Sequence, residues 1–156
     1  MVKSNKIPLG IYVHVPFCRS KCQYCDFYSL GGSREKGLME AYLEAVCLHI
    51  KEAGALAPGY QVDTVYFGGG TPSFLGADGL IQIMNAIRRR FSVSNDGEIT
   101  FEANPDSVTE KLLKRLKAEG FNRISLGVQN DEDALLKKLG RPHSYCLLYT
   151  SDAADD

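Results

Sequence analysis

The sequence predicts an α/β protein built on a parallel β-sheet, with about four β-loop-α units in succession. Two observations carry this prediction. Short runs of β-branched and aromatic residues alternate along the chain with longer segments of helical periodicity. A cysteine cluster, a glycine run, a glutamate and a glutamine each follow one of the strand-like runs. Because the carboxyl ends of parallel strands meet at one edge of a sheet, we expect these motifs to converge there.

The first unit consists of a strand, a cysteine-rich loop and a helix. Residues 10–15 are rich in β-branched and aromatic residues and stop at Pro16, which predicts a short buried strand. Gly31-Gly32-Ser33 predicts a break with a helix cap, followed by a helix over residues 34–53. Cys47 on this helix is interpreted as a small core or half-buried residue. The predicted apolar face comprises Leu38, Tyr42, Ala45, Val46, His49 and Ala53, so we expect His49 to pack in the core.

The second unit begins with a strand over residues 62–67, closed by Gly68-Gly69-Gly70-Thr71-Pro72. A helix is expected over residues 78–91. Its apolar stripe comprises Leu80, Ile81, Met84 and Ile87.

The third unit is predicted to start at a turn, Asn95-Asp96-Gly97, which leads into a strand over residues 98–102. Ser107 is expected to cap the helix that follows, which carries Val108, Leu112, Leu113 and Leu116 and ends at Gly120. In the fourth unit a strand over residues 123–128 precedes a short helix over 131–139, and Gly140-Arg141-Pro142 breaks the chain again.

The composition narrows the range of functions. The chain has 156 residues, of which 44% are hydrophobic and 24% charged, as in a soluble globular protein. A formal net charge of -1 lacks the basic excess of a nucleic-acid-binding protein, so no nucleic acid is expected as a partner. No apolar run reaches the roughly 18 residues of a membrane span. The N-terminus lacks the apolar core of a secretory signal, which predicts a cytoplasmic protein with reduced cysteines.

Three of the five cysteines, Cys18, Cys22 and Cys25, are spaced C-x3-C-x2-C after the first predicted strand. Four thiolates are the usual number for a closed zinc or iron–sulfur site. Three thiolates on a cubane [4Fe–4S] cluster would leave one iron free to bind a small molecule. A zinc ribbon would need a second cysteine pair, and an odd total disfavours a disulfide framework. A zinc module and a site without metal remain alternatives to the iron–sulfur interpretation.

Several other residues at the predicted sheet edge suit ligand binding. Gly68-Gly69-Gly70 is either a plain turn or a place where a ligand approaches the main chain, and Thr71 adds a hydroxyl. Glu102 is either a surface residue or an acceptor for ribose hydroxyls. Gln129 offers an amide. Arg141 suits a carboxylate but equally suits a solvated helix end, and the residues alone leave both open.

Four motifs occur in a fixed order: Tyr12-Val13-His14-Val15-Pro16-Phe17 with the cysteine motif, Gly68-Gly69-Gly70-Thr71-Pro72-Ser73, Glu102-Ala103-Asn104-Pro105, and Ile124-Ser125-Leu126-Gly127-Val128-Gln129. The first resembles the radical S-adenosylmethionine (SAM) superfamily. The others narrow the resemblance to the branch that contains oxygen-independent coproporphyrinogen III oxidases (dehydrogenases) and HemW haem chaperones. The resemblance covers about residues 9–144.

The resemblance implies the N-terminal part of a partial (β/α)6 TIM barrel that holds a [4Fe–4S] cluster and SAM. In such proteins SAM chelates the fourth iron, and an electron from the cluster cleaves it to a 5′-deoxyadenosyl radical. Carried over by position, Cys18, Cys22 and Cys25 match the cluster ligands. The positions that match SAM contacts are Tyr12, Tyr24, Gly69, Gly70, Thr71, Glu102, Gln129 and Arg141.

Phe27 separates the two groups of this branch. The dehydrogenases carry a further cysteine at this position and a longer segment before the first strand, which here begins by about residue 10. Both features favour the HemW group, which implies haem binding and transfer to an acceptor. The alternative is an enzyme that oxidatively decarboxylates coproporphyrinogen III. Implied partners are haem or porphyrin, a reductant such as flavodoxin or ferredoxin, and a membrane-associated haem acceptor. The haem-binding part of the family lies further toward the C-terminus than this sequence reaches.

The end of the sequence departs from the family. Residues 1–145 are assigned to the radical SAM domain in truncated form, whereas 146–156 match nothing expected there. We interpret these last residues as a tail of the kind that read-through into a sequencing adapter produces, and Cys146 is not assigned as a ligand. Four βα units alone would expose a sheet edge and apolar surface, which predicts poor solubility.

Overall fold

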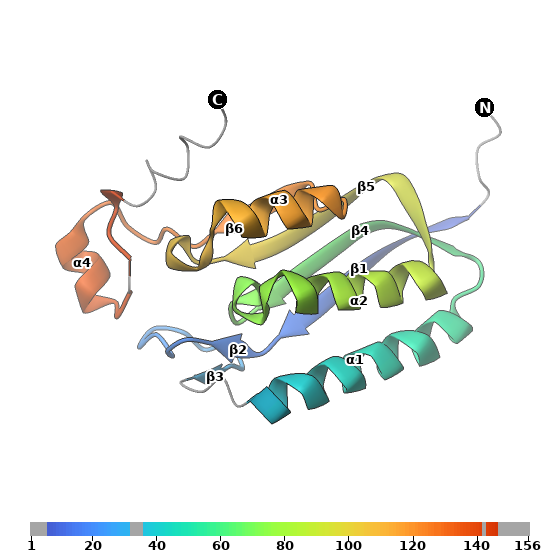
Figure 1. The fold of residues 1–156 in the computed structure, drawn as a ribbon, viewed down its shortest axis with the longest axis horizontal. Helices are drawn as coiled ribbons and strands as arrows, with labels where there is room; N and C mark the ends of the chain where they lie inside the picture. Colours follow the sequence, from blue (N-terminus) through green and yellow to red (C-terminus); the bar gives the residue numbers. More distant parts are fainter. Residues whose placement is uncertain (1–5, 32–35, 142, 147–156) are drawn as a thin grey trace.

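The computed structural model describes residues 6–31, 36–141 and 143–146. Its main sheet is parallel and has the strand order β1-β4-β5-β6. These strands are Ile7–Val15, Tyr60–Gly69, Ser92–Ala103 and Arg123–Leu126. Spatial order equals chain order, so each crossover adds the next strand to the same side of the sheet, as in the wall of a barrel (Figure 1). The predicted α/β class and the succession of βα units are confirmed.

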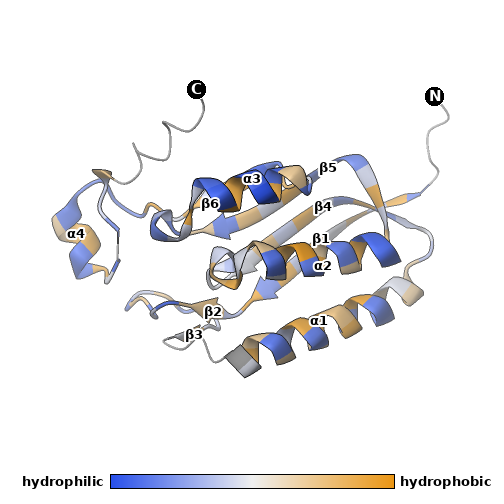
Figure 2. Ribbon diagram, viewed as in Figure 1, coloured by the Kyte–Doolittle hydropathy of each residue, from blue (hydrophilic) through white to orange (hydrophobic). Residues whose placement is uncertain are grey.

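Helices join the consecutive strands of the sheet. They are α1 (Lys36–Leu56), α2 (Gly76–Arg90) and α3 (Glu110–Ala118), while α4 (Asp133–Lys138) follows β6. In the view of Figure 1, α2 and α3 overlap the strands, and α1 runs below β1. Each alternates hydrophobic and hydrophilic residues along its length (Figure 2), as expected for a helix with one buried face. Two short 3-10 helices, η1 (Pro72–Leu75) and η2 (Pro105–Ser107), follow β4 and β5.

The two faces of the sheet differ in character because side chains along a strand alternate between them. One face packs against the helices to form the core. Its buried strand residues are Val13, Val15, Val65, Phe67, Ile99 and Phe101, and the helices contribute Leu80, Ile83, Met84, Ile87, Leu112 and Leu116. The opposite face carries polar and aromatic side chains. On it Tyr12 stacks on Tyr66 with ring centroids 6.2 Å apart, and Tyr12 is 56% exposed.

The predicted apolar face of α1 is only partly right. Tyr42 and Val46 pack against the core as expected, but Leu38, Ala45 and His49 are exposed, so the prediction of a core His49 is wrong. The observed face comprises Met39, Tyr42, Leu43, Val46 and Ile50. Both sets satisfy helical spacing. The neighbouring helix α2 decides between them, and sequence periodicity does not contain that information. Cys47 is half-buried, as expected.

The predicted turn at Asn95-Asp96-Gly97 lies inside β5. This strand pairs with β4 on both sides of the segment, with Val62 opposite Val93 and Thr64 opposite Glu98. Residues 94–97 therefore face a single residue of β4 and form a bulge. A Cβ at Gly97 would lie 3.0 Å from the carbonyl oxygen of Asp63, which explains the glycine.

Ser107 does not cap α3. The cap is Thr109, whose Oγ1 accepts a hydrogen bond from Leu112 N at 3.2 Å, while Ser107 belongs to η2. On α2 the predicted burial of Leu80, Met84 and Ile87 is confirmed, but Ile81 is only half-buried and Ile83, absent from the predicted stripe, is fully buried. The predicted cap at Ser33, the break at Pro142 and the tail from 147 lie outside the described residues. Within the described part, no helix is long and apolar enough to cross a bilayer.

Candidate functional site

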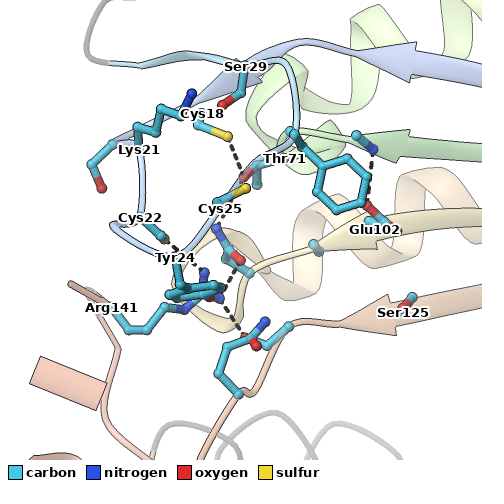
Figure 3. A pocket seen from close by; sticks show the side chains of 18 of the residues that line it. Cys18, Lys21, Cys22, Tyr24, Cys25, Ser29, Thr71, Glu102, Ser125 and Arg141 are labelled. Carbon is cyan, nitrogen blue, oxygen red and sulfur yellow. Dashed lines mark hydrogen bonds between the residues drawn. The ribbon is translucent and has the colours of Figure 1, made fainter. Parts of the chain in front are cut away.

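A cavity of about 340 Å³ lies at the carboxyl edge of the sheet. The motifs that follow the strands line it, so the predicted convergence at this edge is confirmed (Figure 3). All residues assigned from the sequence line this cavity except Tyr12. They are Cys18, Cys22, Cys25, Tyr24, Gly69, Gly70, Thr71, Glu102, Gln129 and Arg141.

The cysteine loop is fixed at its base. A short parallel pair, β2 (Phe17–Cys18) and β3 (Leu30–Gly31), joins the two ends of the loop, and Leu30 N donates to Pro16 O at 2.6 Å. Phe17 is buried and packs edge-on against Tyr42 with centroids 5.3 Å apart. Cys18 in β2 and Cys22 and Cys25 in the loop form no disulfide and are half-buried, and Figure 3 shows all three around one cavity. The loop therefore presents three free thiols from an anchored backbone.

The glycine run at the end of β4, Gly68–Gly70, is packed against the start of this loop. Gly70 N donates to Val15 O at 2.8 Å, and Thr71 N donates to Phe17 O at 2.7 Å. A Cβ on Gly70 would lie 2.7 Å from Phe17 O and 2.8 Å from Val15 O, closer than real side chains come. Gly69 has a φ of +107°, a conformation that favours glycine. The run thus serves close backbone packing, beyond the plain turn that the sequence also allowed.

Glu102 is the last residue but one of β5 and lines the cavity. Its carboxylate accepts hydrogen bonds from Tyr66 OH at 2.6 Å and from Gly69 N at 3.2 Å. The bond to Glu102, with burial, raises the pKa of Tyr66, which therefore stays a neutral donor. Two donors hold the carboxylate in place, and the interpretation of Glu102 as a free surface residue is wrong.

Arg141 reaches the cavity from the segment after α4. Its Nη2 donates to Asn104 Oδ1 and to Gly127 O, both at 2.6 Å, and its Nη1 lies 3.6 Å from Cys22 Sγ. These contacts exclude the solvated helix-end charge, because such a charge would not be held by three groups, and carboxylate binding by Arg141 stays a prediction. Its buried Nε has no partner within the described residues.

Thr71 and Asn104 complete a polar layer beneath the cysteines. Thr71 is buried, and its Oγ1 lies 3.6 Å from Cys18 Sγ and accepts a bond from Asn104 Nδ2 at 3.2 Å. In the sequence, Asn104 is noted only as a member of the Glu102-Ala103-Asn104-Pro105 motif, and no ligand role is predicted for it. An Asn-Pro pair after a strand is a common turn signal, so nothing in the pattern indicated a side chain turned into the site.

Of the remaining predicted ligand contacts, Tyr24 and Gln129 line the cavity and Tyr12 does not. Tyr24 lines the cavity, and burial raises the pKa of its hydroxyl, while the Arg141 charge acts in the opposite direction. Gln129 also lines it and has a φ of 68°, the one positive φ of a non-glycine residue in the described part. Tyr12 lies outside the lining, where its hydroxyl bonds His14 Nδ1 at 3.0 Å.

The chemistry of the wall fits a metal–sulfur cluster with a polar organic ligand. Three free thiols supply the ligands that iron–sulfur clusters take. Donors from Thr71 and Arg141 approach two of the sulfurs. Ser29 Oγ and Arg141 Nε are buried and have no hydrogen-bond partner among the described residues, so both can bond a polar ligand. Among the described residues, no group of three His, Cys, Asp or Glu side chains lies close enough together to hold a single metal ion.

Comparison with known proteins gives a consistent result. The model of the radical SAM superfamily matches residues 12–147. A heme chaperone HemW of Mycobacterium tuberculosis is 38% identical over 138 residues, which cover 88% of this chain and 35% of that protein. HemW of Synechocystis is 41% identical over 141 residues and that of Escherichia coli 38% over 136, covering 34% and 36% of those proteins. The chain thus spans about a third of the length of these relatives.

Among solved structures, coproporphyrinogen III oxidase (HemN) of Escherichia coli, described as a radical SAM enzyme, is similar over 96% of this chain and 34% of its own. The TM-score is 0.86 and the sequence identity 30%. The likeness extends the fold result, because the four parallel βα units correspond to part of a radical SAM barrel.

Proposed function

The chain belongs to the radical SAM superfamily, and from this premise we propose that it forms the N-terminal part of a HemW-type haem chaperone. Its domain would bind a [4Fe–4S] cluster through Cys18, Cys22 and Cys25 and SAM in the adjoining cavity. The observation that carries the proposal is the meeting of three free thiols, Arg141 and the glycine run in one cavity at the carboxyl edge of the sheet.

The residues of this chain have separable parts in that site. The three thiolates would hold three irons of the cluster, which when bound supplies the electron for cleavage of SAM. Arg141 Nε, buried and without a partner among the described residues, suits a carboxylate, because a guanidinium binds carboxylates through directed N–H groups.

Glu102, fixed by Tyr66 and Gly69, suits ribose hydroxyls, which can only donate to a carboxylate. Tyr24, Thr71 and Gln129 are proposed as further SAM contacts, and Tyr12 as one that needs its ring to turn toward the cavity.

Two observations favour the chaperone over the dehydrogenase. The relatives named HemW are 35–41% identical to this chain, whereas the structural relative named as coproporphyrinogen III oxidase is 30% identical. Phe27 stands where the dehydrogenases carry an additional cysteine, and its exposed side chain lines the same cavity. We further propose haem as the cargo, a flavodoxin or ferredoxin as reductant, a membrane-associated acceptor, and a cytoplasmic location.

The first test is cluster assembly in the full-length gene product. After anaerobic reconstitution with iron and sulfide, we expect a brown protein with absorbance near ~400 nm, typical of thiolate-ligated clusters. Cys22→Ala should lose this absorbance and the bound iron. Cys47→Ala is the matched control, because Cys47 lies on α1 and does not line the cavity, and it should keep both. A Cys22→Ala protein with the iron content of the parent contradicts the ligand assignment, and uptake of zinc in place of iron supports the metal-module alternative.

The second test separates chaperone from enzyme. The reconstituted full-length protein is incubated with coproporphyrinogen III, SAM and a reductant, and separately titrated with haem. We expect haem binding and no conversion of coproporphyrinogen III. Formation of protoporphyrinogen would overturn the chaperone proposal in favour of the dehydrogenase.

A further inference from the structure

Asn104 lies at the centre of the polar layer beneath the cysteines. Its backbone is held by Ser107, whose Oγ accepts from Asn104 N at 3.1 Å and donates to Asn104 O at 2.6 Å. Because that Oγ has one hydrogen, Ser73 must be the donor in its 2.5 Å contact with Ser107. The main chain at residue 104 is therefore tied to both 3-10 helices, and the side-chain amide projects from a fixed point.

The direction of the hydrogen bonds around this amide follows from the chemistry of its partners. Arg141 can only donate, so the atom that meets its Nη2 at 2.6 Å must be Asn104 Oδ1. The amide nitrogen must then face Thr71 and donate to its Oγ1 at 3.2 Å. An Oγ1 that accepts from Asn104 has its own hydrogen free for Cys18 Sγ, 3.6 Å away. One amide thus orients the two donors that reach Cys18 and Cys22.

We propose that Asn104 is a positioning residue that directs the Thr71 hydroxyl and the Arg141 guanidinium onto the sulfurs of Cys18 and Cys22, and so sets the reduction potential of the cluster. The inference rests on the proposed function, since it concerns the cluster that these cysteines would hold. Hydrogen bonds to cluster sulfurs stabilise the more negative, reduced state and raise its potential.

Gly127 supplies the space for this arrangement. A Cβ there would lie 3.1 Å from Arg141 Nη2, 3.2 Å from Asn104 Oδ1 and 3.3 Å from Gln129 Nε2. A methyl group would therefore press on the hydrogen bond between Asn104 and Arg141 without altering either side chain. Gly127→Ala therefore perturbs the hydrogen bond between Asn104 and Arg141 without any substitution at Asn104.

The most direct variant is Asn104→Asp, which keeps the shape of the side chain. Asp accepts and does not donate, so Arg141 keeps its partner while the Thr71 hydroxyl turns toward the new carboxylate and away from Cys18. Thr71→Val removes the same hydrogen bond to Cys18 without adding a charge, and Thr71→Ser restores the hydroxyl. A double-mutant cycle between positions 71 and 104 then separates the hydrogen bond from the charge.

The measurement is the midpoint potential of the cluster, titrated anaerobically without SAM and followed by electron paramagnetic resonance, in the reconstituted full-length protein. We expect Thr71→Val and Asn104→Asp to shift the potential to more negative values and Thr71→Ser to return it to that of the parent. In the Thr71→Val background the shift caused by Asn104→Asp should shrink, because its action through the hydroxyl is already gone.

The iron content of the parent protein distinguishes a failure of the proposed function from a failure of the positioning role of Asn104. A parent protein that takes up no iron defeats the proposed function, whereas a loaded parent allows the potentials to decide about Asn104. Equal shifts from Asn104→Asp in both backgrounds, or no shift at all, would overturn the positioning role. If Asn104→Asp fails to load iron, Gly127→Ala decides: a negative shift in a loaded protein supports the role, and an unchanged potential rejects it.

Discussion

Gly70 is packed so closely against the main chain that a side chain has no room there. It has no Cβ, and one added there would lie 2.7 Å from Phe17 O, 2.8 Å from Val15 O and 3.0 Å from Phe17 N. All three neighbours are backbone atoms, so no side-chain rotation relieves the contact. Gly70→Ala must therefore move either the turn after β4 or the segment that leads into the cysteine loop.

The cost follows from the hydrogen bonds that this movement breaks. Val15 O and Phe17 O accept from Gly70 N at 2.8 Å and from Thr71 N at 2.7 Å. Two such bonds at about 1 kcal/mol each, with about 1–3 kcal/mol for overpacking a filled site, predict a loss of about 3–5 kcal/mol in the free energy of unfolding. This is a large part of the roughly 5–15 kcal/mol available to a typical domain.

Denaturation with urea tests the prediction, with the midpoint falling at unchanged slope. Iron uptake should fall as well, because Phe17 and Cys18 belong to the displaced segment. Gly37→Ala is the matched control. Gly37 lies in α1, and a Cβ added there would meet nothing within 4 Å, so the same methyl should stabilise by up to about 1 kcal/mol through helix propensity. A Gly70→Ala midpoint equal to that of the parent would refute the packing argument.

Other predictions concern the cap of α3, the Glu102 site and the response to alkali. Thr109→Ala should lower the free energy of unfolding by about 1 kcal/mol in urea denaturation, because Leu112 N loses its acceptor. Tyr66→Phe should cost about 1 kcal/mol and weaken SAM binding in a calorimetric titration, because Glu102 loses one of its two donors. Burial raises the pKa of Tyr42 to about 12 from 10.0, so the unfolded chain loses this proton first, and stability should hold below pH 10 and fall between pH 10 and 12. Tyr42→Phe should flatten that fall, and an unchanged profile would contradict it.

The sequence was sufficient for the topology because the evidence for it is local. Each strand is a short β-branched or aromatic run and each helix a periodic segment, and consecutive βα units leave few ways to connect them other than a parallel sheet. The same logic located the site, since motifs that follow strands must share an edge. The ligand roles of its residues remain predictions, although the structure brings all but Tyr12 to one cavity.

The predictions of the α3 cap and of the buried face of α1 were wrong because the sequence allowed two equally good choices for each. Ser107 and Thr109 can both cap a helix, and the choice fell on Thr109 because the Asn104 backbone engages Ser107 in η2. His49 satisfies the period of α1, yet α2 packs against the neighbouring stripe and leaves His49 exposed. In each case a tertiary partner that is distant in sequence made the decision.

The polar layer beneath the cysteines shows why such a network escapes sequence analysis, since it depends on strand register. Ala103 pairs with Leu126, and Gly127 N donates to Ala103 O at 2.9 Å, which places Asn104 beside Gly127. On the other side Phe67 pairs with Phe101, so the residues after β4 and β5 end at the same level. A slip of one residue between β5 and β6 would move the side chains of the slipped strand to the opposite face of the sheet and separate Asn104 from Arg141. The contact between Asn104 and Arg141 therefore follows from the same hydrophobic pairing that builds the core, so substitutions that disturb that pairing should alter the site even where they touch none of its residues.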